Sequence, residues 1–358
     1  MTVSDLTEQE LIARVRQKLQ PAPRWMLVGI GDDGAVVEPV RNQLEVLTVD
    51  AIVEGVHFDR RFTPPDAIGH RALAVNLSDL AAMGATPRLA LLSFALPPSL
   101  RCDDFDAMIG GLTSVATAHQ IHVAGGNLTR SPGPLVVDIT AIGSVKRRNV
   151  LTRRGAKPGD AIYVTGTIGG ALAGRQCLES TVRLPPSRPE GASASLTEAR
   201  TINASEVVSG FCRTVIDRYL YPQARVRAGM LLGRNRAATA CMDLSDGLAD
   251  AARQIAEASG VGATIDPASL PIEPAARTWF ESRHADPLTE ALAGGDDYEL
   301  VFTASPKLGS RLRAVARHGG VPLTRIGSCT PEPGLRLRGE IGGLVVDRPL
   351  PRGFSHFR

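Results

Sequence analysis

The stretch Ala74-Val-Asn-Leu-Ser-Asp-Leu-Ala-Ala-Met-Gly-Ala85 places two polar side chains inside an apolar helical pattern. Apolar residues recur at helical spacing from Asp66 to Met83, and Gly84 is expected to end this helix. Asn76 and Asp79 are three positions apart and therefore lie on one face of it. A carboxylate carried into or beside a core must be paired or must bind a metal ion, because an unpaired buried charge is costly.

Two explanations of Asp79 are open. An arginine such as Arg71 or Arg88 would neutralise it in a purely structural ion pair. The alternative is a bound cation, and other aspartates nearby favour it because they compete for the same counter-charge: Asp32, Asp33 and Asp50.

Further segments place an acidic residue, or its amide, at the end of an apolar run and often beside glycine. They are Gly29–Ala35, Leu47–Asp50, Glu54–Phe58, Gly125–Asn127, Met242–Gly247 and Gly294–Leu300. Mg²⁺ takes oxygen ligands, and glycine lets the backbone approach a phosphate closely. The pattern predicts a magnesium site that handles phosphates.

Length and charge limit the class of protein. A chain of 358 residues with 43% apolar content predicts two globular domains. The formal charge is only +3 and the basic residues are dispersed, so the electrostatic footprint of a nucleic-acid partner is missing. No apolar run is long enough to span a bilayer, so no membrane association is expected.

The cysteines favour a reducing, cytoplasmic compartment. They are odd in number and scattered, without the spacing of a zinc site or a disulfide framework. Each is expected to be a small buried apolar residue: Cys102, Cys177, Cys212, Cys241 and Cys329.

The order of elements predicts an α/β (α+β) chain in two units. A polar helix is expected within Met1 to Gln20, with Thr7 and Glu10 as its capping box. Strands are expected at Leu44–Val49, His122–Ala124, Leu135–Ile142, Ala161–Thr165 and Thr239–Asp243, and further helices at Phe105–His119, from Gly169, and at Gly247–Ser259. A boundary near residue 150 divides the chain into 1–149 and 150–358, with an exposed, flexible insert at 181–205.

Other motifs have ordinary explanations beside the functional ones. No Walker A sequence occurs, and the glycines from Gly166 to Gly174 favour tight packing over a dinucleotide turn. Ser245 or Asp246 could simply cap a helix, whereas Asp243, closing a strand, has no capping duty. His57 is either structural or, being close to Asp50 in sequence, a substrate contact.

These segments, in this order, resemble the thiamine-monophosphate kinase family of the aminoimidazole-ribotide-synthetase-like superfamily. The resemblance runs from Gly29 to the closing Gly353-Phe-Ser-His-Phe357, and residues 181 to 205 are its main gap. Its most specific parts are Ala74–Ala85 and Gly294–Leu300. It implies an N-terminal mixed sheet that pairs across a homodimer, a C-terminal α/β domain, and ATP with several Mg²⁺ ions near the dimer interface.

The resemblance also implies roles for individual residues. Metal ligands fall on Asp33, Thr48, Val49, Asp50, Asp79, Asn127, Asp243 and Asp246, of which Asp50, Asp79 and Asp243 would be catalytic. ATP contacts fall on Gly126, Asn127, Arg153 and Ser245, and thiamine-monophosphate contacts on His57, Asp296 and Phe354. Three positions depart from the family's commonest pattern: Val49 stands for Thr, Asp296 for Glu, and Asn127 for Asp.

The implied reaction is the phosphorylation of thiamine monophosphate to thiamine diphosphate by in-line transfer from ATP. The acceptor phosphate is already largely anionic at neutral pH, so no general base is expected. One alternative is another ATP-dependent enzyme of the superfamily, although selenophosphate synthetases need a reactive Cys near the N-terminus and the first here is Cys102. The other is a nucleotide-binding homologue with weakened catalysis, supported by Asn127.

Overall fold

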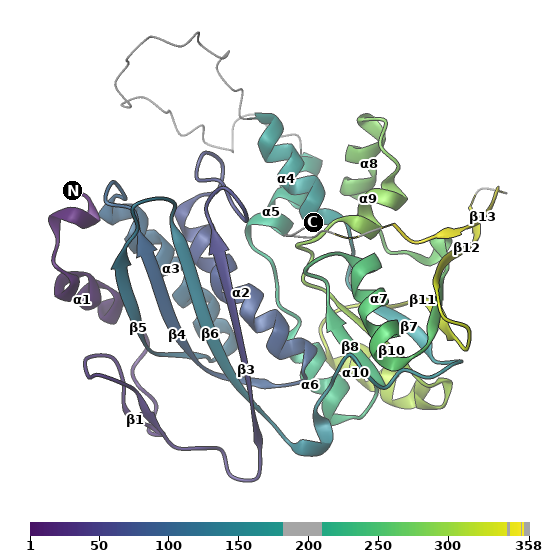
Figure 1. Cartoon of the computed structure of the whole chain (residues 1–358), viewed down its shortest axis with the longest axis horizontal. Helices are drawn as coiled ribbons and strands as arrows, with labels where there is room; N and C mark the ends of the chain where they lie inside the picture. Colours follow the sequence, from purple (N-terminus) through teal and green to yellow (C-terminus); the bar gives the residue numbers. More distant parts are fainter. Residues whose placement is uncertain (182–209, 342–343, 352, 354–358) are drawn as a thin grey trace, which may run out of the picture.

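Two sheets, side by side in Figure 1, organise the chain, which a computed structural model describes at residues 1–181, 210–341, 344–351 and 353. The predicted α/β class is confirmed. The division into residues 1–149 and 150–358 remains our proposal. The predicted insert lies, after residue 181, outside the described residues, and so does Phe354.

The N-terminal sheet has four strands in the order β3-β6-β4-β5. Their bounds are β3 (Leu44–Val53), β4 (Thr86–Leu96), β5 (His122–Arg130) and β6 (Val136–Val145). β4 and β5 run parallel while the other pairs are antiparallel, so the predicted mixed sheet is confirmed. A small ribbon of β1 (Met26–Val28) and β2 (Val36–Val37) stands apart from it.

Two long helices, α2 (Pro65–Ala82) and α3 (Cys102–His119), lie behind this sheet in Figure 1. Both confirm predicted helices. They pack closely because glycines face backbone: a Cβ on Gly69 would lie 1.8 Å from the carbonyl oxygen of Met108, and one on Gly111 1.9 Å from that of Asp66. α2 is buried over most of its length, including Asn76.

The N-terminal helix α1 (Glu8–Lys18) confirms the predicted capping box. The backbone N–H of Thr7 donates to the Glu10 carboxylate at 2.7 Å, and the Glu10 N–H donates to the Thr7 hydroxyl at 3.3 Å. These bonds satisfy donors that a helix start leaves without intrahelical partners.

Three predicted strand ends are wrong, and one of them is that of β6, which continues past Ile142 to Val145. β3 continues to Val53, so Asp50 lies within the strand instead of closing it, because Ala51, Ile52 and Val53 keep pairing with β6. β5 continues past Ala124 to Arg130 along β4, and Asn127 is therefore also inside a strand.

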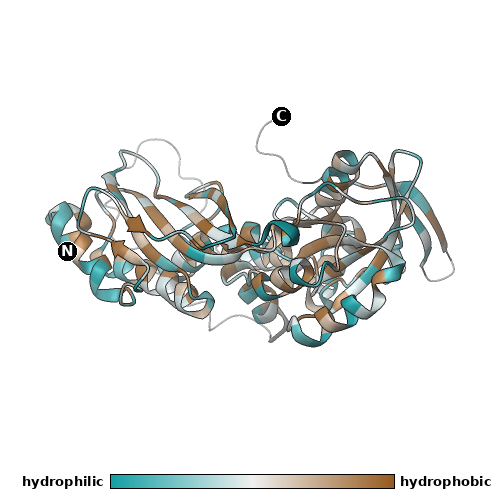
Figure 2. Cartoon of the chain, turned by 90° about the horizontal axis from the view of Figure 1, so that it is seen from below, coloured by the Kyte–Doolittle hydropathy of each residue, from teal (hydrophilic) through white to brown (hydrophobic). Residues whose placement is uncertain are grey.

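The C-terminal sheet has seven described strands in the order β13-β12-β9-β11-β7-β10-β8. They are β7 (Ala161–Thr165), β8 (Ala240–Asp243), β9 (Gly262–Ile265), β10 (Leu300–Ala304), β11 (Leu323–Thr330), β12 (Leu335–Ile341) and β13 (Leu344–Pro349). The helices of this half are α4 (Gly170–Thr181), α5 (Gly210–Leu220), α6 (Val226–Arg234), α7 (Leu248–Ser259), α8 (Pro274–Ser282), α9 (Pro287–Ala293) and α10 (Gly309–His318). Apolar residues run along the strands of both sheets in Figure 2.

The two outer glycines of the run from Gly166 to Gly174 pack closely, as the ordinary explanation predicts. A Cβ on Gly166 would lie 2.2 Å from the Glu299 carboxylate, and one on Gly174 1.9 Å from the carbonyl oxygen of Val215. The start of α4 already has an internal anion, because Asp297 accepts from the backbone N–H groups of Gly169 and Ala171 at 2.6 and 3.1 Å. A cofactor phosphate has no place there.

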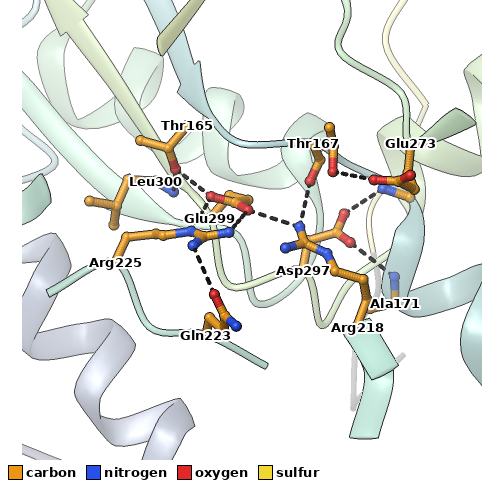
Figure 3. Close-up of polar contacts among 11 residues, drawn as sticks. Thr165, Thr167, Ala171, Arg218, Gln223, Arg225, Glu273, Asp297, Glu299 and Leu300 are labelled. Atoms are coloured by element: carbon orange, nitrogen blue, oxygen red, sulfur yellow. Dashed lines mark hydrogen bonds and ion pairs between the residues drawn. The ribbon is translucent and has the colours of Figure 1, made fainter. Parts of the chain in front are cut away.

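A buried carboxylate, Glu299, joins several elements of the C-terminal half (Figure 3). Arg218 of α5 donates to it at 2.8 Å, Arg225 forms an ion pair with it through Nε and Nη2, and the Thr165 hydroxyl donates to it at 2.6 Å. Because β10 begins at Leu300, this network fixes the segment Gly294–Leu300 just before the strand.

Four of the five cysteines are buried as predicted, and Cys212 is half-buried. All five are free thiols. Among the described residues, no helix has both the length and the apolar character needed to cross a membrane.

Candidate active site

A cavity of about 570 Å³ lies where the two halves meet, and it brings together most of the predicted site residues. From the N-terminal half it is lined by Asp50, Val56, His57, Val75 and Asp79. From the C-terminal half it is lined by Arg153, Leu172, Arg175, Asp243, Ser245, Asp246, Asp296, Tyr298 and Gly353, among others. We refer to it as the first cavity.

Strand alternation places Thr48 and Asp50 on the face of β3 that lies against α2. The residues between and beside them, Leu47, Val49 and Ala51, are exposed on the opposite face. The hydroxyl of Thr48 donates a hydrogen bond to Asp79 of α2. Thr48 and Asp79 thus come together, whereas the side chain of Val49 lies on the other side of the sheet, so only its backbone could serve a site shared with them.

Asp243, the last residue of β8, adds a third carboxylate. It is 3% exposed and accepts a hydrogen bond from the Ser78 hydroxyl of α2 at 2.7 Å. α2 therefore contributes both Asp79 and the serine that contacts Asp243. This hydrogen bond joins α2 of the N-terminal half to β8 of the C-terminal half at the first cavity.

The pKa values of Asp50 and Asp243 are strongly raised. Burial raises the pKa of Asp50 to about 7, and the negative charges of Asp79 and then Asp243 add to the shift. Burial and the charge of Asp79 likewise raise the pKa of Asp243 to about 7. Such a group of acids binds either protons or a cation at neutral pH.

The structural explanation of Asp79, an ion pair with a nearby arginine, is not observed among the residues that the structure describes. Arg71 pairs with Asp296 at 3.1 Å. Arg88 lies over the ring of Trp25, 4.4 Å from its centroid, and its nearest carboxylate is that of Glu45 at 4.0 Å. Neither arginine supplies the positive charge that Asp50, Asp79 and Asp243 need.

The turn after β8 presents Ser245 and Asp246 to the first cavity. α7 begins at Leu248 and its N-cap residue is Gly247, so neither residue holds the capping position suggested as the ordinary explanation. The segment Gly294–Leu300 packs directly on this turn, because the Asp296 N–H donates to the Ser245 carbonyl at 2.8 Å. A Cβ on Gly295 would lie 2.3 Å from that same oxygen, which explains the glycine.

Asp33, Gly126 and Asn127 line a second cavity, of about 870 Å³. In the sheet register Asn127 lies opposite Ser93, which lies opposite Asp138, which lies opposite Ala51. Neighbouring strands are about 4.8 Å apart, so Asn127 is about 14 Å across the sheet from β3. One ion cannot be ligated by both Asn127 and Asp50 in this arrangement, since ligand distances are about 2.1 Å.

Sequence reasoning missed Asp138 of β6. It lines the second cavity, and its buried Oδ1 has no hydrogen-bond partner among the described residues. Its negative charge contributes to the raised pKa of Asp50. The sequence signal was weak, because a charged residue within the predicted strand Leu135–Ile142 is also what a solvent-facing position of an ordinary strand shows.

Of the predicted substrate contacts, His57 and Asp296 meet in the first cavity. His57 Nδ1 accepts a hydrogen bond from the backbone N–H of Val53 at 3.1 Å, at the end of β3. Arg153 also lines this cavity, and its guanidinium donates to the side-chain oxygen of Gln254.

The donor set of the first cavity fits a hard cation. Its ligand candidates are carboxylate and hydroxyl oxygens, which Mg²⁺ prefers over nitrogen or sulfur. Within residues 1–181, 210–341, 344–351 and 353, no three His, Cys, Asp or Glu side chains already stand in the geometry of a metal site. The raised pKa values of Asp50 and Asp243 indicate where positive charge is lacking.

Comparison with known proteins places the chain in a family. The N-terminal domain model of the AIR synthase related proteins matches residues 31–145, and the C-terminal domain model matches residues 157–340. Thiamine-monophosphate kinase of Escherichia coli K12 is 35% identical, over 98% of this chain and 98% of the relative. The chain belongs to the thiamine-monophosphate kinase family.

Solved structures of the thiamine-monophosphate kinase family have the same fold. The enzyme from Stenotrophomonas maltophilia K279a is 37% identical, with a TM-score of 0.78 over 94% of this chain and 98% of that chain. AaThiL, solved in complex with AMPPCP and TMP, is 29% identical, with a TM-score of 0.72 over 100% of this chain and 99% of that one.

Proposed function

We propose that this protein phosphorylates thiamine monophosphate to thiamine diphosphate with ATP, by direct in-line transfer assisted by several Mg²⁺ ions. The observation that carries the proposal is the first cavity, where acidic residues of both halves gather and, within the described part of the chain, no ion pair to Asp50, Asp79 or Asp243 is formed. Relatives named thiamine-monophosphate kinase, and a relative complexed with AMPPCP and TMP, support the choice of substrates.

The acidic residues suit a phosphoryl transfer in which metal ions neutralise the charges of the phosphates and no proton has to be removed from the acceptor. The acceptor is a phosphate monoester whose attacking oxygen is largely anionic at neutral pH, so no base has to deprotonate it. Mg²⁺ held at the site would offset the repulsion between this oxygen and the ATP phosphates. The residues of the chain then act by holding ions and substrates in line.

We assign ion binding in the first cavity to Asp50, Asp79, Asp243 and Asp246, with Thr48 beside them. The backbone of Val49, on the same strand as Thr48 and Asp50, would join these ligands. Asp33 and Asn127 would serve other ions, since they line the second cavity and Asn127 lies across the sheet from β3. ATP contacts are proposed for Gly126, Asn127, Arg153 and Ser245. Thiamine-monophosphate contacts are proposed for His57, Asp296 and Phe354.

The active form is proposed to be a homodimer in the cytoplasm. The face of the N-terminal sheet opposite α2 exposes the neighbouring apolar side chains of Leu47 and Val49 to 65% and 59%. A second copy covering this face would bury it, and would also adjoin the second cavity, which opens on the same face. Five free thiols suit a reducing compartment.

The test is a coupled assay of ADP release with thiamine monophosphate beside unphosphorylated thiamine. Mg²⁺-dependent ADP release is expected with the phosphate ester alone. Equal turnover of both compounds would contradict the proposal, because a hydroxyl acceptor needs a general base. EDTA should abolish turnover while the circular dichroism spectrum stays that of the folded protein.

A further inference from the structure

Arg71 of α2 is a permanently charged side chain with only 1% of its surface exposed, next to the first cavity. Its Nη1 donates to the backbone carbonyl of Tyr219, and its guanidinium lies 4.4 Å from the centroid of the Tyr219 ring. Its Nη2 donates to Oδ1 of Asp296 at 3.1 Å. A buried guanidinium requires such a partner, so Arg71 and Asp296 depend on each other.

The two oxygens of Asp296 differ in their surroundings. Oδ1 accepts from Arg71 and also from the Tyr298 hydroxyl, each at 3.1 Å. Oδ2 accepts no hydrogen bond from the residues that the structure describes, although Asp296 lines the first cavity and keeps 29% of its side chain exposed. One oxygen is therefore fixed by the protein, and the other is available to a ligand.

The backbone of this segment is also held in an unusual shape. Asp296 has φ 67° and Tyr298 has φ 49°, a left-handed conformation that costs energy for residues other than glycine. Surrounding contacts must maintain it. The bond from the Asp296 N–H to the Ser245 carbonyl and the bond from Arg71 to the Asp296 carboxylate are such contacts.

The same cluster reaches His57. The Tyr219 hydroxyl of α5 donates to the backbone carbonyl of His57 at 3.2 Å, while the Tyr219 ring covers Arg71. His57 and Asp296, which line this end of the first cavity, are thus held by contacts from three separate elements: α2, α5 and the segment Gly294–Leu300.

We propose that Arg71, Tyr219 and Tyr298 are positioning residues for the acceptor substrate. Arg71 and Tyr298 fix Oδ1 of Asp296 so that Oδ2 accepts a hydrogen bond from an N–H donor on the acceptor's heteroaromatic ring. Tyr219 fixes Arg71 and the backbone of His57 at the same end. The inference rests on the proposed function and names the residues that set its acceptor affinity.

The decisive variant is Tyr298→Phe, which removes one hydroxyl and keeps the ring. Its KM for thiamine monophosphate should rise roughly tenfold, because the lost hydrogen bond from Tyr298 orients the Asp296 carboxylate that contacts the acceptor. The kcat and the KM for ATP should stay within about twofold of the wild-type values. Arg71→Lys keeps the charge without the two-pronged geometry, and should raise the same KM at least as much.

Tyr221→Phe is the matched control. The Tyr221 hydroxyl donates to the carboxylate of Asp66 at 2.7 Å, outside the first cavity, so its loss should leave both KM values unchanged. Wild-type KM values in Tyr298→Phe would overturn the positioning role. The role would also be overturned if Tyr298→Phe lowered kcat, raised both KM values and lowered the melting temperature together, because that pattern indicates a structural role only. A wild-type protein that does not turn over thiamine monophosphate would refute the proposed function and this inference together.

Discussion

Asp79 occupies the centre of the acidic group, because it accepts from Thr48 and its charge raises the pKa of both Asp50 and Asp243. We predict that Asp79→Ala folds but loses activity by at least roughly a hundredfold, the cost of a strong electrostatic contact in a transition state. Steady-state ADP release at saturating Mg²⁺ measures it. Asp103→Ala, which removes a carboxylate with 81% of its side chain exposed, is the control and should retain full activity.

At the residue scale, sequence patterns predicted which acidic residues come together better than they predicted where those residues lie in the strands. Asp79 and Asp243 were singled out as site candidates because a charge in an apolar helix, or at the end of a buried strand, has few structural explanations, and both line the first cavity. Asp138 was missed because an acid inside an alternating strand looks like an ordinary solvent-facing residue. Only the register that sets it opposite Ala51 and Ser93 shows its place at a cavity.

At the scale of elements, the ion pairs of Glu299 hold the segment before β10 (Figure 3). Glu299→Gln should lower the free energy of unfolding by about 3–5 kcal/mol, because it leaves Arg218 and Arg225 without their buried counter-charge. Urea denaturation measures the change. Glu179→Gln is the control: its exposed pair with Arg175, at 3.6 Å, should contribute under about 0.5 kcal/mol. Equal stability of the two variants would contradict the prediction.

Helices were predicted more accurately than strand ends, and the reason is physical. α2 is set by apolar residues at helical spacing and by the glycine after it, all of which are local. The end of β3 is set by its pairing with β6, more than eighty positions later in the chain, so Asp50 could not be placed inside the strand from its own neighbours. For the same reason no local pattern could show that Asn127 lies across the sheet.

For the whole molecule, the raised pKa values of Asp50 and Asp243 predict how stability depends on pH. Both are raised from 3.8 to about 7, so the folded protein retains protons that the unfolded chain has released. The free energy of unfolding in EDTA should therefore fall as pH rises from about 4 to 7 and then level off. Mg²⁺ should increase stability most at the upper end, where its ligands are ionised.

Melting temperatures at several pH values, with EDTA and with Mg²⁺, provide the measurement. Asp50→Asn should show a weaker pH dependence in EDTA than the wild-type protein and a smaller gain from Mg²⁺. The histidines and Asp297, whose pKa is also raised, are present in both proteins. The difference between the two pH profiles therefore reports the acidic residues of the first cavity. Identical profiles would show that the pKa of Asp50 is not raised in the folded protein.

The largest scale is the assembly, where the bare face of the N-terminal sheet makes a definite prediction. Leu47 and Val49 project from β3 on the side away from α2, and a charge there would have to be desolvated if a second chain covers the sheet. Val49→Asp should therefore shift a homodimer toward monomer at micromolar concentration, as measured by sedimentation velocity. Val345→Asp, on the 83% exposed Val345 of β13, should leave the mass unchanged. A Val49→Asp variant that stays dimeric would place the subunit contact elsewhere on the molecule. A wild-type protein that sediments as a monomer would contradict the homodimer itself and leave the exposed apolar face without its proposed cover.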